Sequence, residues 1–179
     1  NERVARFIKS LLFSNLKKRY KIAFLLSHPI QYYVPLFKKI AAHPELDIMV
    51  YFCSPHGLEE TFDPSFGLSY KWDIPLLDGY PSAFLKNYSL RPSPSRFFGL
   101  INPGIIKELY RGKYDALVVH GYSLATTWLA FLGCWLTRTP IFLRGESQLL
   151  NERPGWKKFA KKILLTPLFR TMAAFLAIG

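Results

Sequence analysis

The fold of this chain is decided by residues 115–146, which read DALVVHGYSLATTWLAFLGCWLTRTPIFLRGE. Residues 115–120 are a β-branched run that is too short for a helix, so they predict a buried strand. Residues 124–138 are apolar on nearly every side, which is typical of a buried helix. Pro140 ends that helix, and residues 141–143 predict a second apolar strand. A strand, a helix and a strand in this space predict a right-handed parallel βαβ unit.

The predicted helix follows a turn at Gly121, a residue type that permits tight turns. Ser123 is expected to cap the helix by accepting the amide proton of Thr126. The uncharged run 116–137 is long enough to cross a bilayer, but the stretch 120–123 (HGYS) interrupts it. We therefore expect a buried crossover helix and not a transmembrane span.

The same alternation of strand and helix recurs along the rest of the chain. Residues 21–27 and 46–53 predict buried strands on either side of a helix over 35–42. Asn102 is expected to cap a further helix, and residues 174–178 predict a last strand. The alternation predicts an α/β fold: a Rossmann-like, doubly wound parallel sheet with helices on both faces.

Residues 54–100 break this alternation, because they are rich in proline and in aromatic side chains. Residues 70–77 are expected to form an edge strand, and the remainder is interpreted as a long ordered loop. The aromatic content argues against disorder. The segment suits the binding of a sugar or lipid acceptor, and it equally suits a packed satellite of the core.

The net charge of +12 is concentrated in two flanking segments. Residues 1–21 hold seven Lys or Arg against one acid, residues 22–150 hold eleven against ten, and residues 151–179 hold six against one. This distribution argues against a nucleic-acid-binding domain with a basic face. It favours local attraction to an anionic surface such as a membrane.

The chain is expected to contain an N-terminal helix and one domain. Residues 1–20 predict a basic amphipathic helix, which would lie on an anionic membrane or pack on the domain as an arm. Residues 21–179 predict the Rossmann-like domain. Cys53 and Cys134 lack the spacing of metal ligands. We therefore expect two buried reduced thiols in a cytoplasmic protein, and neither a metal nor another cofactor.

Polar side chains follow the predicted strands at their carboxyl ends, where parallel sheets bind ligands. His120 could be a general base, a hydrogen-bond partner of a substrate, or a satisfied core histidine. Arg144 and Glu146 could bind an anionic substrate and a hydroxyl, or form a structural ion pair. His28 and Gln31 follow the first strand. The sequence therefore predicts that polar groups from three strand ends meet on one rim.

Motifs of several other chemistries are missing from the sequence. No G-x-G-x-x-G follows a predicted strand, and there is no P-loop, no G-x-S-x-G and no H-E-x-x-H. A dinucleotide site, a nucleophile elbow and a zincin site are therefore not expected.

Four segments of the chain resemble the N-terminal half of a retaining GT-B glycosyltransferase of family 4. They read KIAFLLSHPIQYYVPLF, LDIMVYFCS, KYDALVVHGYSLATTWLAFLGCWLTRTPIFLRGES and AFLAIG, and the resemblance covers residues 21–179. It implies two Rossmann-like domains that face a cleft. The N-terminal domain would bind the acceptor. The C-terminal domain, which this chain would lack as a piece of a longer protein, would bind the nucleotide-sugar donor.

The resemblance also implies roles for individual residues. His120 matches a histidine that contacts the donor sugar near the reaction centre, so it would be the catalytic residue. The loop after the first strand would approach the donor phosphates and the acceptor. The substrate-binding residues would be His28, Gln31, Gly121, Arg144 and Glu146. Many members carry a glycine pair where this chain has His28 and Pro29.

A membrane-docking helix is a further implied element. The stretch 156–165 resembles the basic amphipathic helix through which members that use lipid-linked acceptors bind membranes. The membrane-contacting lysines would be Lys157, Lys158, Lys161 and Lys162. The expected location is therefore peripheral, on the cytoplasmic face of the membrane.

These observations lead to one function and one alternative. The leading function is transfer of a hexose from a nucleotide-sugar to a lipid-linked or polysaccharide acceptor in polysaccharide biosynthesis. The isolated chain would then be inactive without its C-terminal domain. The alternative is a non-catalytic module that binds a membrane surface, or a subunit completed by a partner chain. Nucleic acid is not an expected partner.

Overall fold

The computed structural model of the chain describes residues 19–58, 61–63, 68–70, 75–145, 163 and 165–176. Residues 1–18 of the predicted N-terminal helix lie outside this range. So do Glu146 and the four lysines that were expected to contact a membrane. The expectations about these residues stay predictions.

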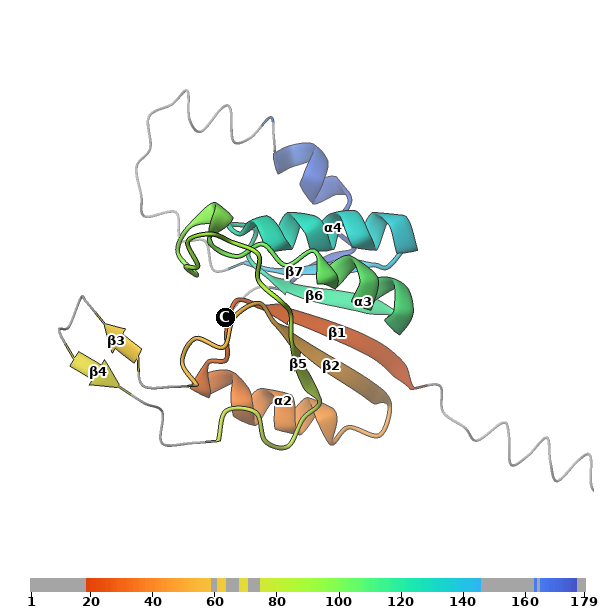
Figure 1. The fold of residues 1–179 in the computed structure, drawn as a ribbon. Coiled ribbons are helices and arrows are strands. Elements are labelled where there is room, and N and C mark those ends of the chain that lie inside the picture. The colour runs from red at the N-terminus through yellow and green to blue at the C-terminus, as the bar shows by residue number, and fades with distance from the viewer. Residues whose placement is uncertain are drawn as a thin grey trace, which may run out of the picture.

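The core of the fold is a six-stranded sheet in which all neighbouring strands are parallel (Figure 1). Its strands are β1 (Tyr20–Leu26), β2 (Leu46–Phe52), β5 (Ser82–Phe84), β6 (Ala116–His120), β7 (Ile141–Arg144) and β8 (Ala174–Leu176). Their spatial order is β5-β2-β1-β6-β7-β8. Counted along the chain within this sheet, that is the order 3-2-1-4-5-6 of the doubly wound fold. The predicted fold class is confirmed.

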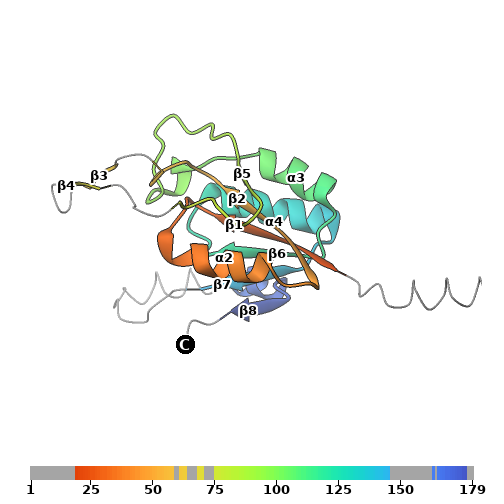
Figure 2. The same ribbon diagram turned by 90° about the horizontal axis from the view of Figure 1, so that it is seen from below.

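Helices cover both faces of the sheet (Figures 1 and 2). One face carries α2 (Val34–Ala41), and the other carries α3 (Gly104–Gly112) and α4 (Ala125–Thr137). Successive side chains of a strand point to opposite faces. Accordingly, Ala23 and Leu25 of β1 belong to the cluster beneath α3 and α4, and Phe24 and Leu26 belong to the cluster beneath α2. Hydrophobic burial on both faces explains why residues 22–26 of β1 are an uninterrupted apolar run.

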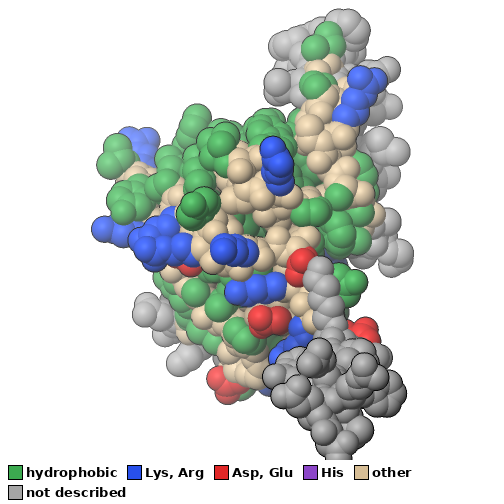
Figure 3. Space-filling view, turned by 90° about the vertical axis from the view of Figure 1, so that its right-hand side faces the viewer, with side chains coloured by type: hydrophobic (Ala, Val, Ile, Leu, Met, Phe, Trp, Pro, Cys, Tyr) green, Lys and Arg blue, Asp and Glu red, His purple; other side chains and the backbone are tan. Residues whose placement is uncertain are grey.

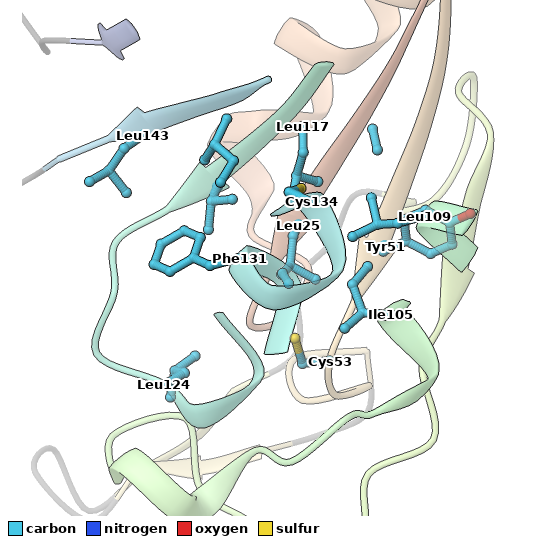
Figure 4. Packing of buried hydrophobic residues seen from close by; sticks show 14 of the residues in the cluster. Leu25, Tyr51, Cys53, Ile105, Leu109, Leu117, Leu124, Phe131, Cys134 and Leu143 are labelled. Atoms are coloured by element: carbon cyan, nitrogen blue, oxygen red, sulfur yellow. The ribbon is translucent and has the colours of Figure 1, made fainter. Parts of the chain in front are cut away.

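The layer between α3, α4 and the sheet is tightly packed (Figure 4). Phe131 and Cys134 of α4 are fully buried in it. A methyl group placed on Gly133 would lie 2.9 Å from Leu109 Cδ1 and 3.3 Å from Ile106 Cα, both in α3. The two helices can approach this closely because Gly133 has no side chain.

The predicted βαβ unit is confirmed as β6, α4 and β7, but both predicted helix caps are wrong. The N-cap residue of α4 is Leu124 and has no capping side chain. The Thr126 amide donates instead to the backbone oxygen of Leu100, at 3.2 Å, and not to Ser123. Asn102 does not cap α3 either, because its side chain is used in a buried network that is described below. A tertiary partner displaces the local cap in both places.

The expectation that α4 is buried all round is wrong over its second half. Leu132, Trp135 and Leu136 are 43%, 47% and 69% exposed. On the side of the molecule seen in Figure 3, hydrophobic side chains stand exposed among Lys and Arg side chains. The helix has 13 residues. None of the helices that the structure describes is long and apolar enough to span a membrane.

The proline-rich segment is built differently from the prediction. Residues 75–77 are not in a strand, so the predicted edge strand over 70–77 is wrong there. The edge strands of the six-stranded sheet are β5 and β8. β3 (Thr61–Asp63) and β4 (Leu68–Tyr70) form a separate antiparallel pair. Cys53 and Cys134 are free and buried, as expected.

Candidate functional site

The winding of the sheet reverses between β1 and β6, and ligands of doubly wound folds bind outside the carboxyl ends of the strands at this point. His120 is the last residue of β6 and pairs in register with Arg144, the last residue of β7. Gly121 follows with a φ of +73°, and its amide donates to the Arg144 oxygen at 2.9 Å. A methyl group on Gly121 would touch nothing within 4 Å. The glycine is therefore required by backbone conformation and not by space.

Tyr33 joins these two strand ends. It is the last residue of the short 3-10 helix η1 (Gln31–Tyr33), which follows β1, and its side chain is 4% exposed. Its hydroxyl lies 3.1 Å from His120 Nδ1, and the two rings meet edge to face with centroids 4.8 Å apart. The Arg144 guanidinium carbon lies 4.9 Å from the centre of the Tyr33 ring. Side chains from three segments of the chain thus form one cluster.

The cluster keeps His120 neutral. Burial, and then the charge of Arg144, lowers the pKa of His120 from 6.5 to about 4. A general base works best when its pKa lies near the working pH. At neutral pH, a pKa of about 4 leaves the imidazole with little affinity for a proton. The arrangement suits a neutral hydrogen-bonding group beside a fixed cation, and it disfavours the general-base role.

His28 lies on the same edge but contacts a different group. Its Nδ1 is 2.9 Å from the Ser27 hydroxyl, and its ring meets that of His56 edge to face at 5.3 Å between centroids. Burial, and then the charge of His56, lowers the pKa of His28 to about 4. His28 is therefore a second neutral imidazole, in contact with His56 and separate from the cluster of Tyr33, His120 and Arg144.

The structure says less about the other two predicted substrate-binding residues, Gln31 and Glu146. Gln31 is exposed at the start of η1. Glu146 lies outside the described residues, so its pairing with Arg144 stays open. No group of three or more His, Cys, Asp or Glu side chains that could hold a metal occurs in the described part of the chain.

Sequence reasoning missed Tyr33 and His56 as site residues. His56 comes three residues after Cys53, at the carboxyl side of the second strand, so the rule that selected His28 would also have found it. Tyr33 carries no such signal. It is 87 residues from His120 in the chain, and only the adjacency of β1 and β6 brings them together.

A buried polar network holds the loops of this edge in place. Asn102 is fully buried, and its side-chain nitrogen donates to the backbone oxygens of Cys53 and Leu85, both at 2.9 Å. The Thr126 hydroxyl donates to Asn102 Oδ1, at 2.7 Å, or to the oxygen of Leu100, at 2.8 Å. The network thereby joins the ends of β2 and β5 to the first turn of α4.

The loop between β5 and α3 leaves aromatic side chains exposed beside this network. Tyr88, Phe97 and Phe98 are 58%, 42% and 70% exposed, and Phe97 and Phe98 stack edge to face at 4.8 Å. The base of the loop is fixed, since Asn87 accepts the amide of Ile101 at 2.9 Å. An exposed aromatic surface on a fixed loop can bind the apolar face of a sugar or a lipid chain.

No protein-family model and no curated protein sequence matches the chain. Among solved structures, the chain is similar to MurG of Acinetobacter baumannii, with a TM-score of 0.50 and 12% sequence identity. The match covers 88% of this chain and 41% of the MurG chain, so this chain spans less than half the length of MurG. MurG is a GT-B glycosyltransferase, and the parallel sheet described above matches half of that fold. The likeness does not support the narrower assignment to family 4.

Proposed function

We propose that this chain is the acceptor-side half of a retaining GT-B glycosyltransferase. It would act with a second, donor-binding domain and transfer a hexose from a nucleotide-sugar to a lipid-linked or polysaccharide acceptor. The observation that carries the proposal is the position of His120. It is a neutral histidine beside Arg144, at the switch point of a sheet that matches half of a GT-B fold.

The chemistry of sugar transfer needs the two kinds of group that this site holds. As the glycosidic bond to the nucleotide breaks, negative charge develops on the departing diphosphate. A fixed cation such as Arg144 stabilises that charge. A neutral imidazole can donate a hydrogen bond to a sugar hydroxyl and hold the ring in place while its own protonation state stays constant. His120 and Arg144 would therefore orient the sugar and stabilise the leaving group, and no metal ion is required in this scheme.

The acceptor would approach from the aromatic loop between β5 and α3. Its exposed rings, which include Tyr88 and Phe98, support an acceptor with apolar faces, either a sugar chain or a lipid. The basic segments 1–21 and 151–179 support peripheral attachment to the cytoplasmic face of an anionic membrane.

The test is an assay of nucleotide-sugars with the protein that carries both GT-B halves. His120→Ala should lower kcat/KM by roughly 10²–10³, as loss of a transition-state hydrogen-bond donor does. His43→Ala is the matched control, because His43 is exposed in the turn after α2, before the amino end of β2. Both variants should stay folded, which circular dichroism and a cooperative thermal unfolding transition would show. NMR of the product should show retention of the anomeric configuration.

Three results would count against this function. Unchanged turnover of His120→Ala would remove His120 from the mechanism. Sugar transfer by the 179-residue chain alone would contradict the need for a second domain. If the protein binds anionic vesicles and transfers no sugar from any nucleotide, the non-catalytic membrane module becomes the better interpretation.

A further inference from the structure

Tyr33 contacts both side chains on which the proposed function depends. Its hydroxyl meets His120 Nδ1, and its ring faces the Arg144 guanidinium. The ring itself has little freedom, because it is 4% exposed and lies 5.9 Å from the ring of Phe37 in α2. A fixed side chain that contacts two polar groups can set the position of both.

The contact with Tyr33 also bears on which nitrogen of His120 carries the proton. A neutral imidazole has one N–H donor and one acceptor nitrogen. A cation over the face of a phenol ring draws electron density from the hydroxyl and makes it a stronger donor, and Arg144 occupies this position. This favours Tyr33 as the donor to Nδ1, which places the proton of His120 on Nε2.

The remaining nitrogen of His120 is accessible. Every buried side-chain nitrogen or oxygen among the described residues has a hydrogen-bond partner. The contact of His120 with Tyr33 uses Nδ1, and the structure gives Nε2 no partner within the described part of the chain. Nε2 is therefore not a buried atom, and it points away from Tyr33 on the far side of the imidazole ring. An Nε2–H there is available to a ligand.

We propose that Tyr33 is a positioning residue that fixes His120 as an Nε2–H donor and holds Arg144 beside it. The pair then presents one neutral donor and one cation to a ligand that combines hydroxyl and phosphate oxygens, as a nucleotide-sugar does. The consequence for catalysis rests on the proposed function. The position of the proton on His120 does not depend on the proposed function, and it can be measured without turnover.

The first experiment is NMR of the His120 imidazole nitrogens in the ¹⁵N-labelled 179-residue chain near neutral pH. In the wild type, Nε2 should carry the proton, and Nδ1 should show the shift of a hydrogen-bonded acceptor. Tyr33→Phe keeps the ring and removes the hydroxyl. The Nδ1 resonance should then move to that of an unbonded nitrogen. The pKa of His120 should rise by about 0.5–1 pH unit, because the neutral form loses a hydrogen bond.

Tyr32→Phe is the matched control. Tyr32 is 58% exposed, its ring lies 4.4 Å from that of Tyr33, and the structure gives it no contact with His120. The His120 resonances and pKa should be those of the wild type. A wild-type proton on Nδ1 would overturn the proposal. So would a Tyr33→Phe spectrum in which the His120 signals and pKa are unchanged.

The second experiment measures turnover in the protein with both GT-B domains. Tyr33→Phe should lower kcat about 5- to 10-fold and change KM by less than about twofold, since the ring that holds Arg144 is kept. Tyr32→Phe should keep wild-type kinetics. If the NMR result holds but no nucleotide-sugar is used, the proposed function fails and the positioning by Tyr33 stands. If transfer occurs and Tyr33→Phe keeps the wild-type kcat, the positioning role is overturned.

Discussion

Replacing Asn102 with alanine should lower the free energy of unfolding by about 2–4 kcal/mol, which is large for one polar side chain. Asn102 is fully buried and contributes both of its amide atoms to hydrogen bonds. Its nitrogen satisfies the backbone oxygens of Cys53 and Leu85, and its oxygen is an acceptor for Thr126. Alanine would leave the two carbonyl oxygens buried without this partner, whereas the Thr126 hydroxyl can still donate to the Leu100 oxygen.

The magnitude follows from the two carbonyl oxygens. A buried polar group that loses its partner costs about 1–3 kcal/mol. Here two buried groups, the backbone oxygens of Cys53 and Leu85, would lose theirs. We take the lower part of the summed range, because water entering the space of the amide would restore part of the hydrogen bonding. For a protein of this size, each kcal/mol lowers Tm by about 2–4 °C. The expected fall in Tm is therefore roughly 4–16 °C.

The assay is urea unfolding followed by circular dichroism, with Asn87→Ala as the matched control. Asn87 also uses both amide atoms, accepting from the amides of Ser89 and Ile101 and donating to the Gly99 oxygen. It is only partly buried, so water can replace the lost bonds, and the variant should lose about 1 kcal/mol or less. The reasoning is refuted if Asn102→Ala loses no more stability than Asn87→Ala.

Two further outcomes follow from the packing and the electrostatics. Burial holds the pKa of His120 at about 4 against 6.5 in the unfolded chain, so the unfolded chain binds more protons between these values. The stability that comes from neutral His120 is complete above pH 6.5 and is lost as the pH falls towards 4. His120→Gln should flatten the stability–pH curve in this window, and equal slopes in urea unfolding would contradict the burial. Separately, Gly133→Val should cost about 1–3 kcal/mol, because its methyl groups meet Leu109 and Ile106 of α3. Gly104→Ala, with nothing within 4 Å, should be neutral or stabilising by up to about 1 kcal/mol, and equal Tm values for the two variants would contradict the close packing of α3 and α4.

The sequence by itself determined the layered α/β architecture. Burial on both faces makes residues 22–26 of β1 and 116–119 of β6 continuous apolar runs, and the helix between β6 and β7 is longer than either strand. These are local properties of the chain, so they can be seen without knowing any neighbour. The same holds for the polar residues that end the strands, such as His120 and Arg144, because strand direction alone places them on one edge.

Only the tertiary structure decided what those polar residues contact. The order of the strands places β6 beside β1, and this brings Tyr33 to His120 although 87 residues separate them in the chain. The caps predicted at Ser123 and Asn102 failed for the same reason, since distant groups at Leu100 and Cys53 compete successfully with the local partner. Local chemistry limits which hydrogen bonds a side chain can make. Strand order and packing select among them, because they fix the distant groups that come within reach.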